Sequence, residues 1–172
     1  LVCGLGLLTF PALAHGARLF FSPSSGTFTI GSTFDIALLL DTEEEMINAF
    51  KIRLQFPPDK LQLISPSTGK SIVRVWTGPP QFNNRTGEVE LQGGIPNGIN
   101  VSQGLISQLS FRVKQVGTAV VKIGDESLVL LHDGKGTDVL EQTEHGVYAL
   151  VLPPPAGPIV ASETHPDQSQ WY

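Results

Sequence analysis

The sequence predicts an all-β protein, an antiparallel β-sandwich of jelly-roll topology with about nine strands. Two observations carry this prediction: apolar residues recur at every second position in several short runs, and clusters of Gly, Pro, Asn, Asp and Ser separate the runs. No run of ten or more residues has the apolar spacing of a helix. Without helices to make parallel crossovers, two antiparallel sheets packed face to face are expected.

The clearest strand is expected over residues 49–56, where inward and outward positions alternate. The apolar positions are Phe50, Ile52, Leu54 and Phe56, and the polar positions between them are Lys51, Arg53 and Gln55. Such alternation buries one face of a strand and leaves the other in water. The same pattern recurs over 34–40 and 105–113. Shorter strands are expected at 19–21, 27–30, 61–64, 72–76, 88–92, 119–123, 127–131 and 147–152.

Turn chemistry separates these strands. Residues 57–59, 65–69, 83–87, 96–98 and 133–136 are rich in Pro, Gly, Asn and Asp, which favour turns over sheet interiors.

Length and composition limit what the chain can be. With 172 residues it has room for one ordinary domain and flanking segments. A net charge of -5 offers no basic surface for phosphates, which argues against a nucleic-acid partner. The single cysteine, Cys3, lies near the N-terminus, so core packing and not an internal disulfide must stabilise the domain.

Residues 1–14 predict export. This run carries no charge and closes on Ala12-Leu13-Ala14, the small-x-small pattern of a signal-peptidase site, so cleavage is expected after Ala14. Because the chain opens on Leu without a basic segment, we expect this signal peptide to be N-terminally truncated. The predicted location is therefore secreted or at the cell surface. The alternatives are an uncleaved membrane anchor, which needs about 20 apolar residues, and a buried core strand.

The folded domain is expected over residues 15–152. Residues 153–158 read PPPAGP, a stiff extended linker that cannot join a sheet interior. Residues 159–172 are too short to fold alone, and we interpret them as the start of a further module.

Several of these segments, in this order, resemble a cohesin, the β-sandwich module that binds dockerin modules in cellulose-degrading scaffolds. The residues that carry the resemblance are DIALLL at 35–40, NAFKIRLQFPPDKL at 48–61, GEV at 87–89 and GLISQLSFRVK at 104–114. The resemblance implies a non-enzymatic extracellular binding module of a multimodular bacterial protein, with a dockerin-like protein partner. Related carbohydrate-binding modules share the sandwich.

In dockerin-binding cohesins one sheet face makes the contact, with Asn and Asp pointing outward from the strand before the aromatic turn. This sequence carries Ala49 and Lys51 at those places, a departure from the family pattern. The predicted binding surface consists of two outward rows, Lys51, Arg53 and Gln55 on one strand and Glu88, Glu90 and Gln92 on another. Opposite charges in these rows could instead be mutual cross-strand pairs with no partner.

A carbohydrate-binding module is the first alternative, with a polysaccharide as the partner. Trp76 and Phe82 flank a loop that could display both rings to a sugar, although a large ring at a strand end also suits a core. A structural spacer in a surface-protein stalk is the second alternative. Membrane contact is expected only through the N-terminal signal or an anchor elsewhere in the parent protein.

No catalytic residue, cofactor or metal is predicted. The chain lacks the GxSxG, HExxH and phosphate-loop motifs, and its four histidines lack zinc spacing. The carboxylates at 41–45 and the loop 132–138 hold calcium-type oxygen ligands but lack the spacing of a calcium loop. We therefore expect a solvated connector at the first and a glycine turn at the second.

Overall fold

The computed structural model describes residues 16–155. Within that range the chain forms thirteen strands and no helix, so no helix there is long and apolar enough to cross a membrane. The predicted all-β sandwich is confirmed, with thirteen strands instead of about nine. They are β1 (Ala17–Ser22), β2 (Ser25–Thr29), β3 (Thr33–Asp41), β4 (Ile47–Gln55), β5 (Leu61–Ser67), β6 (Val75–Trp76), β7 (Gln81–Asn83), β8 (Glu88–Ile99), β9 (Gly104–Val113), β10 (Gly117–Ile123), β11 (Leu128–Leu131), β12 (Leu140–Thr143) and β13 (Gly146–Val151).

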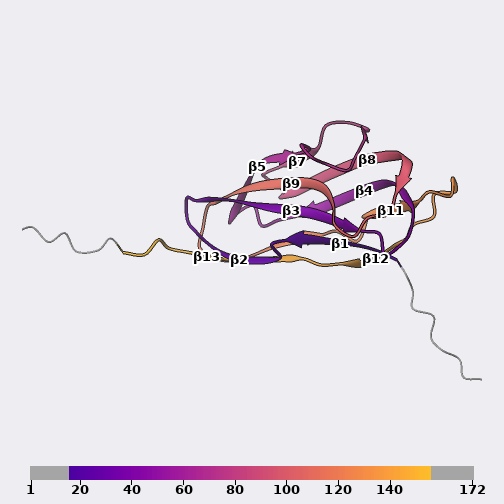
Figure 1. The fold of residues 1–172 in the computed structure, drawn as a ribbon. Coiled ribbons are helices and arrows are strands. Elements are labelled where there is room, and N and C mark those ends of the chain that lie inside the picture. The colour runs from indigo at the N-terminus through magenta and orange to yellow at the C-terminus, as the bar shows by residue number, and fades with distance from the viewer. Residues whose placement is uncertain (1–15, 156–172) are drawn as a thin grey trace, which may run out of the picture.

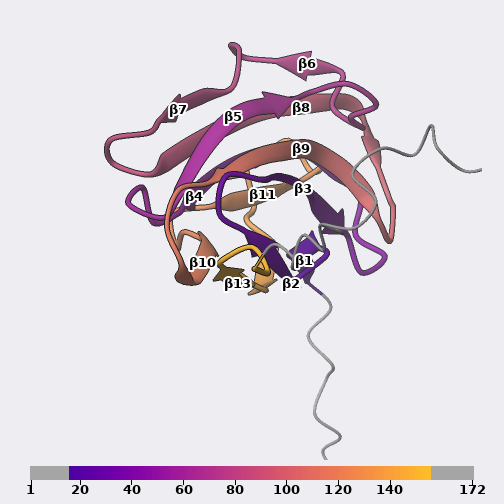
Figure 2. The same cartoon turned by 90° about the vertical axis from the view of Figure 1, so that its left-hand side faces the viewer.

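The strands lie in two layers (Figure 1). One sheet has the order β12-β1-β3-β9-β5, and the other has the order β2-β13-β10-β4-β8-β6, with β11 also on β4 and β7 also on β8. In the view of Figure 2, β6, β7 and β8 lie at the top of the molecule, and β2 and β13 at the bottom. The eight-stranded sheet therefore has β8 and its neighbours at one side and β2 at the other.

Two strand pairs depart from the expected antiparallel arrangement. β1 pairs with β12 and β2 pairs with β13, both in parallel. β1 belongs to the five-stranded sheet and β2 to the eight-stranded sheet, so the chain changes sheet between Ser22 and Ser25. β2 thereby becomes the terminal strand of the larger sheet.

The core fills the space between the sheets with the predicted inward residues. Phe50, Ile52, Leu54 and Phe56 are each at most 4% exposed. Phe28 and Phe34 stack with ring centroids 3.9 Å apart, and the Tyr148 hydroxyl beside them donates to the Pro23 carbonyl at 2.8 Å. Because the inward side chains form one continuous core, the outward side chains of both sheets are not needed for packing and can contact a partner.

Several predicted boundaries were wrong. Residues 96–98, expected as a turn, lie inside β8, where Gly98 has φ of 67° and the register opposite shifts between Ile47 and Ala49. β5 continues through Pro66. A proline is tolerated at this position because β5 is an edge strand of its sheet, so no neighbouring strand on its outer side requires a backbone N–H from it. The expected strand 72–76 shrinks to Val75–Trp76. β7 and β12 were not predicted.

The segments predicted at the two chain ends lie largely outside the described residues. The signal segment 1–14, its cleavage site Ala14 and the tail 156–172 all lie there. Residues 153–155 belong to no strand.

Candidate functional site

The six residues predicted as a binding surface lie together on the outer face of the eight-stranded sheet. The antiparallel register of β4 and β8 places Lys51 opposite Gln92, Arg53 opposite Glu90 and Gln55 opposite Glu88. Directly opposed residues share a face of the sheet, and the residues between them are buried in the core. The structure therefore joins the two predicted rows into one surface.

Ion pairs link the two rows. The Glu90 carboxylate lies 3.5 Å from Arg53 Nε and 3.9 Å from Lys51 Nζ, and Arg53 also pairs with Glu126. These side chains remain between 37% and 69% exposed. Water and salt screen such pairs, so each contributes at most about 1 kcal/mol to folding. The charges are therefore held in place while staying accessible.

Strand β7, which the sequence did not reveal, extends this face at its edge. Gln81 lies opposite Glu90, and Asn83 lies opposite Glu88. On the other side of β4, Lys122 of β10 lies opposite Gln55. Together these strands form a shallow groove whose polar lining includes Arg53, Gln55, Gln81, Asn83, Glu88, Glu90, Lys122, Glu126 and His145.

The opposite half of the same face is apolar. Val75 and Ala49 both lie opposite Gly94, and Leu130 lies opposite Ala49 on the next strand. Val75 is 51% exposed and Leu128, opposite Lys51, is 38% exposed. The outer face thus has a charged half and an apolar half, with Lys51 at the boundary.

The two rings considered for sugar stacking differ in their surroundings. Trp76 is half-buried and packs edge-on against Phe50, with ring centroids 5.9 Å apart. Trp76 lies on β6 opposite Gly93 of β8, and the two strands approach closely because Gly93 has no side chain. A Cβ on Gly93 would be 2.6 Å from Val73 Cγ1. Phe82 is 42% exposed at the rim of the polar groove. Of the two rings, Phe82 therefore has the larger exposed fraction.

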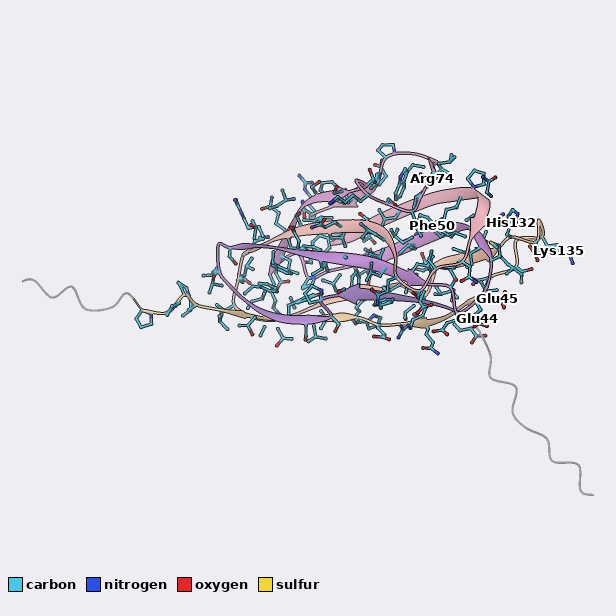
Figure 3. The ribbon with its side chains drawn as sticks, viewed as in Figure 1. Glu44, Glu45, Phe50, Arg74, His132 and Lys135 are labelled. Carbon is cyan, nitrogen blue, oxygen red and sulfur yellow. The ribbon has the colours of Figure 1, made fainter. Side chains whose placement is uncertain are left out.

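The acidic segments lie away from this face. In Figure 3, Glu44 and Glu45 lie at the same end of the sandwich as Lys135. Asp133 accepts hydrogen bonds from the Thr137 hydroxyl and the Lys135 N–H, and these bonds lower the pKa of the Asp133 carboxyl. Residues 16–155 contain no group of three or more His, Cys, Asp or Glu side chains that could hold a metal ion.

No protein-family model matches the chain, and no curated protein sequence matches it. Solved structures do. A type I cohesin from Pseudobacteroides cellulosolvens has a TM-score of 0.68 at 10% identity, covering 85% of this chain and 99% of that one.

Two further structures show the same likeness. The cohesin of a type I cohesin–dockerin complex from Clostridium thermocellum has a TM-score of 0.66 at 14% identity, covering 80% of this chain and 95% of that one. A non-cellulosomal cohesin from the archaeon Archaeoglobus fulgidus has a TM-score of 0.63 at 15% identity, covering 79% and 91%. The chain therefore has the fold of the cohesin modules.

Proposed function

We propose that this chain is a non-catalytic binding module that docks a dockerin-type protein partner on the outer face of the eight-stranded sheet. The observation that carries the proposal is the composition of that face. It places accessible, mutually oriented charges on β4 and β8 beside exposed apolar residues that include Val75 and Leu128. Protein interfaces commonly combine an apolar area with polar groups that orient the partner.

The structural neighbours support the choice of partner class. Cohesins of the same fold were solved in complex with dockerins, from Clostridium thermocellum and from Acetivibrio cellulolyticus. Because Ala49 and Lys51 occupy the outward positions where dockerin-binding cohesins carry Asn and Asp, we infer a partner with its own specificity. A cation at Lys51 favours an acidic or carbonyl-rich counterpart at that position.

We further propose that the module is exported and acts in a larger secreted or cell-surface protein. The uncharged run ending at Ala14 supports export, and the proline-rich segment after Leu152 supports a linker to another module. The mature N-terminus of protein recovered from outside the cell tests this directly. Recovery of chains that begin at His15 would support cleavage, and retention of residues 1–14 would contradict it.

The test of the binding function is capture followed by titration. The immobilised chain is incubated with the extracellular fraction of the source cells, and any captured protein is purified and its affinity measured. We expect Lys51→Glu with Arg53→Glu to abolish capture, because the two substitutions replace cations of the face by anions and leave Glu90 without its paired charges. The matched control is Arg112→Glu with Lys135→Glu, which makes the same change in net charge at exposed positions on other surfaces. Equal loss in both variants would contradict a specific role for β4.

An insoluble-polysaccharide depletion assay runs beside the capture experiment. Phe82→Ala is the informative variant there, because Phe82 is exposed whereas Trp76 supports the core. Depletion of the wild type that Phe82→Ala abolishes would favour the carbohydrate-binding alternative. If the chain captures no protein and is not depleted by polysaccharide, the structural-spacer alternative is favoured.

A further inference from the structure

The free edge of β2 differs from the other terminal strand edges of the two sheets. On β5, Pro66 has no backbone N–H, and the side-chain amide of Asn84 already forms hydrogen bonds with the backbone N–H and carbonyl of Leu63. β12 carries the charged Glu141, and β6 and β7 are only two and three residues long. Such features discourage a strand of another chain from pairing at an edge. β2 reads Ser-Gly-Thr-Phe-Thr and has no charge, proline or register shift.

The backbone of β2 has unpaired groups that point away from the sheet. Val147 N donates to the Ser24 carbonyl at 2.8 Å, and Ile30 N donates to the Val151 carbonyl at 2.9 Å. In a parallel pair alternate residues face the neighbouring strand, so Gly26 and Phe28 bond to β13.

By the same alternation, Ser25, Thr27 and Thr29 present their N–H and carbonyl groups to the free edge. The Thr29 carbonyl accepts from Ser32, through its N–H at 3.1 Å and its hydroxyl at 2.6 Å. No described residue bonds to the outward groups of Ser25 or Thr27. A row of donors and acceptors at strand spacing is therefore open.

The side chains of the two strands nearest this edge, β2 and β13, are uncharged. The side chains of Ser25, Thr27 and Thr29 share the outer face with Val147, Ala149 and Val151 of β13, to which they are paired. Thr118 and Val120 continue that face on β10. Although the chain has a net charge of -5, two copies that meet here bring no like charges together.

We propose that a second copy of this chain pairs with β2 along this edge, antiparallel and about a two-fold axis. Thr27 then lies opposite Thr27 of the other copy, and Ser25 lies opposite Thr29. Every cross-strand pair on the outer face becomes a hydroxyl pair, of the kind that stabilises antiparallel sheets. The strand is thus complementary to itself, which is what a two-fold interface requires. The pairing does not depend on the proposed binding function.

The pairing has a consequence for recognition. A two-fold axis that pairs two edges antiparallel runs normal to the sheet, so both outer faces point the same way. β2 and β8 lie at opposite sides of the sheet, separated by β13, β10 and β4, so the charged face stays uncovered. Two modules would bind a bivalent partner more tightly than one does. Five-residue edges make a small interface, so the association is weak and concentration-dependent.

Sedimentation of the full 172-residue chain tests the proposal, in reducing buffer so that Cys3 cannot cross-link copies. We expect the wild-type average mass to rise from monomer toward dimer with concentration. Thr27→Lys and Thr27→Glu, each placing like charges on the two-fold axis, should both remain monomeric. An equimolar mixture of the two should dimerise again, because Lys then faces Glu. Thr118→Lys, on the same face but away from the edge, should dimerise like the wild type.

Amide hydrogen exchange identifies the surface. The outward amides of Ser25 and Thr27 should gain protection as concentration rises, while those of Gly26 and Phe28 are protected at all concentrations. A monomeric wild type would overturn the proposal, as would a dimer in which Ser25 and Thr27 gain no protection. A Thr27 amide protected equally at every dilution would mean that another segment of the same chain covers the edge, and this too would overturn it.

Discussion

The side-chain amide of Asn84 pairs with both backbone groups of Leu63. Its Oδ1 accepts from the Leu63 N–H at 2.8 Å, and its Nδ2 donates to the Leu63 carbonyl at 2.9 Å. Asn84 follows β7, whereas Leu63 belongs to β5 in the opposite sheet. One side chain thus replaces a missing strand neighbour and ties the two layers together.

We therefore expect Asn84→Ala to lower the free energy of unfolding by about 1–3 kcal/mol, because it leaves two partly buried backbone groups without partners. Urea denaturation measures the change. Gln62→Ala is the control, since Gln62 is exposed on the same strand and should change stability by no more than about 0.5 kcal/mol. Similar losses in both variants would mean that β5 is sensitive to any substitution.

Much of this architecture follows from local pattern. The alternation over β4 fixes which side chains point outward, so Lys51, Arg53 and Gln55 could be placed on one face without coordinates. The inward row is large and apolar, and shifting the register by one residue would expose it. The cross-strand position of Arg53 opposite Glu90 depends on how β4 pairs with β8, two strands distant in the sequence. The alternation therefore predicted the two outward rows but not the register between them.

The elements that were missed lack such a pattern. β7, with Gln81, Phe82 and Asn83, is exposed throughout. It is a strand only because its backbone pairs with the edge of β8. Gly98 looked like a turn because Asn-Gly usually makes one, yet here its positive φ serves a bulge inside β8. The parallel pairing of β2 depends on where the chain changes sheet, which no local signal indicates.

Removing the ion-pair cation Arg53 should affect binding far more than folding. Its contacts with Glu90 and Glu126 are exposed to solvent, so we expect Arg53→Ala to destabilise the chain by less than about 1 kcal/mol. Its buried neighbour Ile52 serves as the contrast, and Ile52→Ala should cost about 2–5 kcal/mol. Thermal unfolding distinguishes the two. A large loss on Arg53→Ala would show that binding defects in β4 variants reflect unfolding.

Adjacent glycines in β8 should respond differently to the same substitution. A Cβ on Gly93 would meet Val73 Cγ1 at 2.6 Å and the Val75 carbonyl at 3.0 Å, whereas on Gly94 the nearest atom is 3.4 Å away. We expect Gly93→Ala to push β6 outward and to cost about 1–3 kcal/mol. Gly94→Ala should stay within about 0.5 kcal/mol of wild type.

Tryptophan fluorescence reports the displacement, because Trp76 of β6 lies opposite Gly93. In a Trp171→Phe background Trp76 is the only tryptophan of the chain. Its emission should shift to longer wavelength in Gly93→Ala and remain unchanged in Gly94→Ala. Unshifted emission in both variants would contradict the close approach of β6.

Tyr148 should make stability fall at high pH. Burial raises the pKa of its hydroxyl above the ordinary value, so the folded state keeps the proton that the unfolded state loses above about pH 10. The unfolded state then binds fewer protons, and the free energy of unfolding decreases with pH, by roughly 1.4 kcal/mol at about pH 11.

Tyr148→Phe isolates this effect. At about pH 8 the variant should be less stable by about 1 kcal/mol, because it loses the hydrogen bond to the Pro23 carbonyl. Phe has no proton to lose, so the stability gap should close or reverse by about pH 11. Urea denaturation of both proteins across that interval measures the gap. A gap independent of pH would mean that the folded chain lets Tyr148 ionise as freely as the unfolded chain does, and the hydroxyl would then have to be open to water instead of held against Pro23.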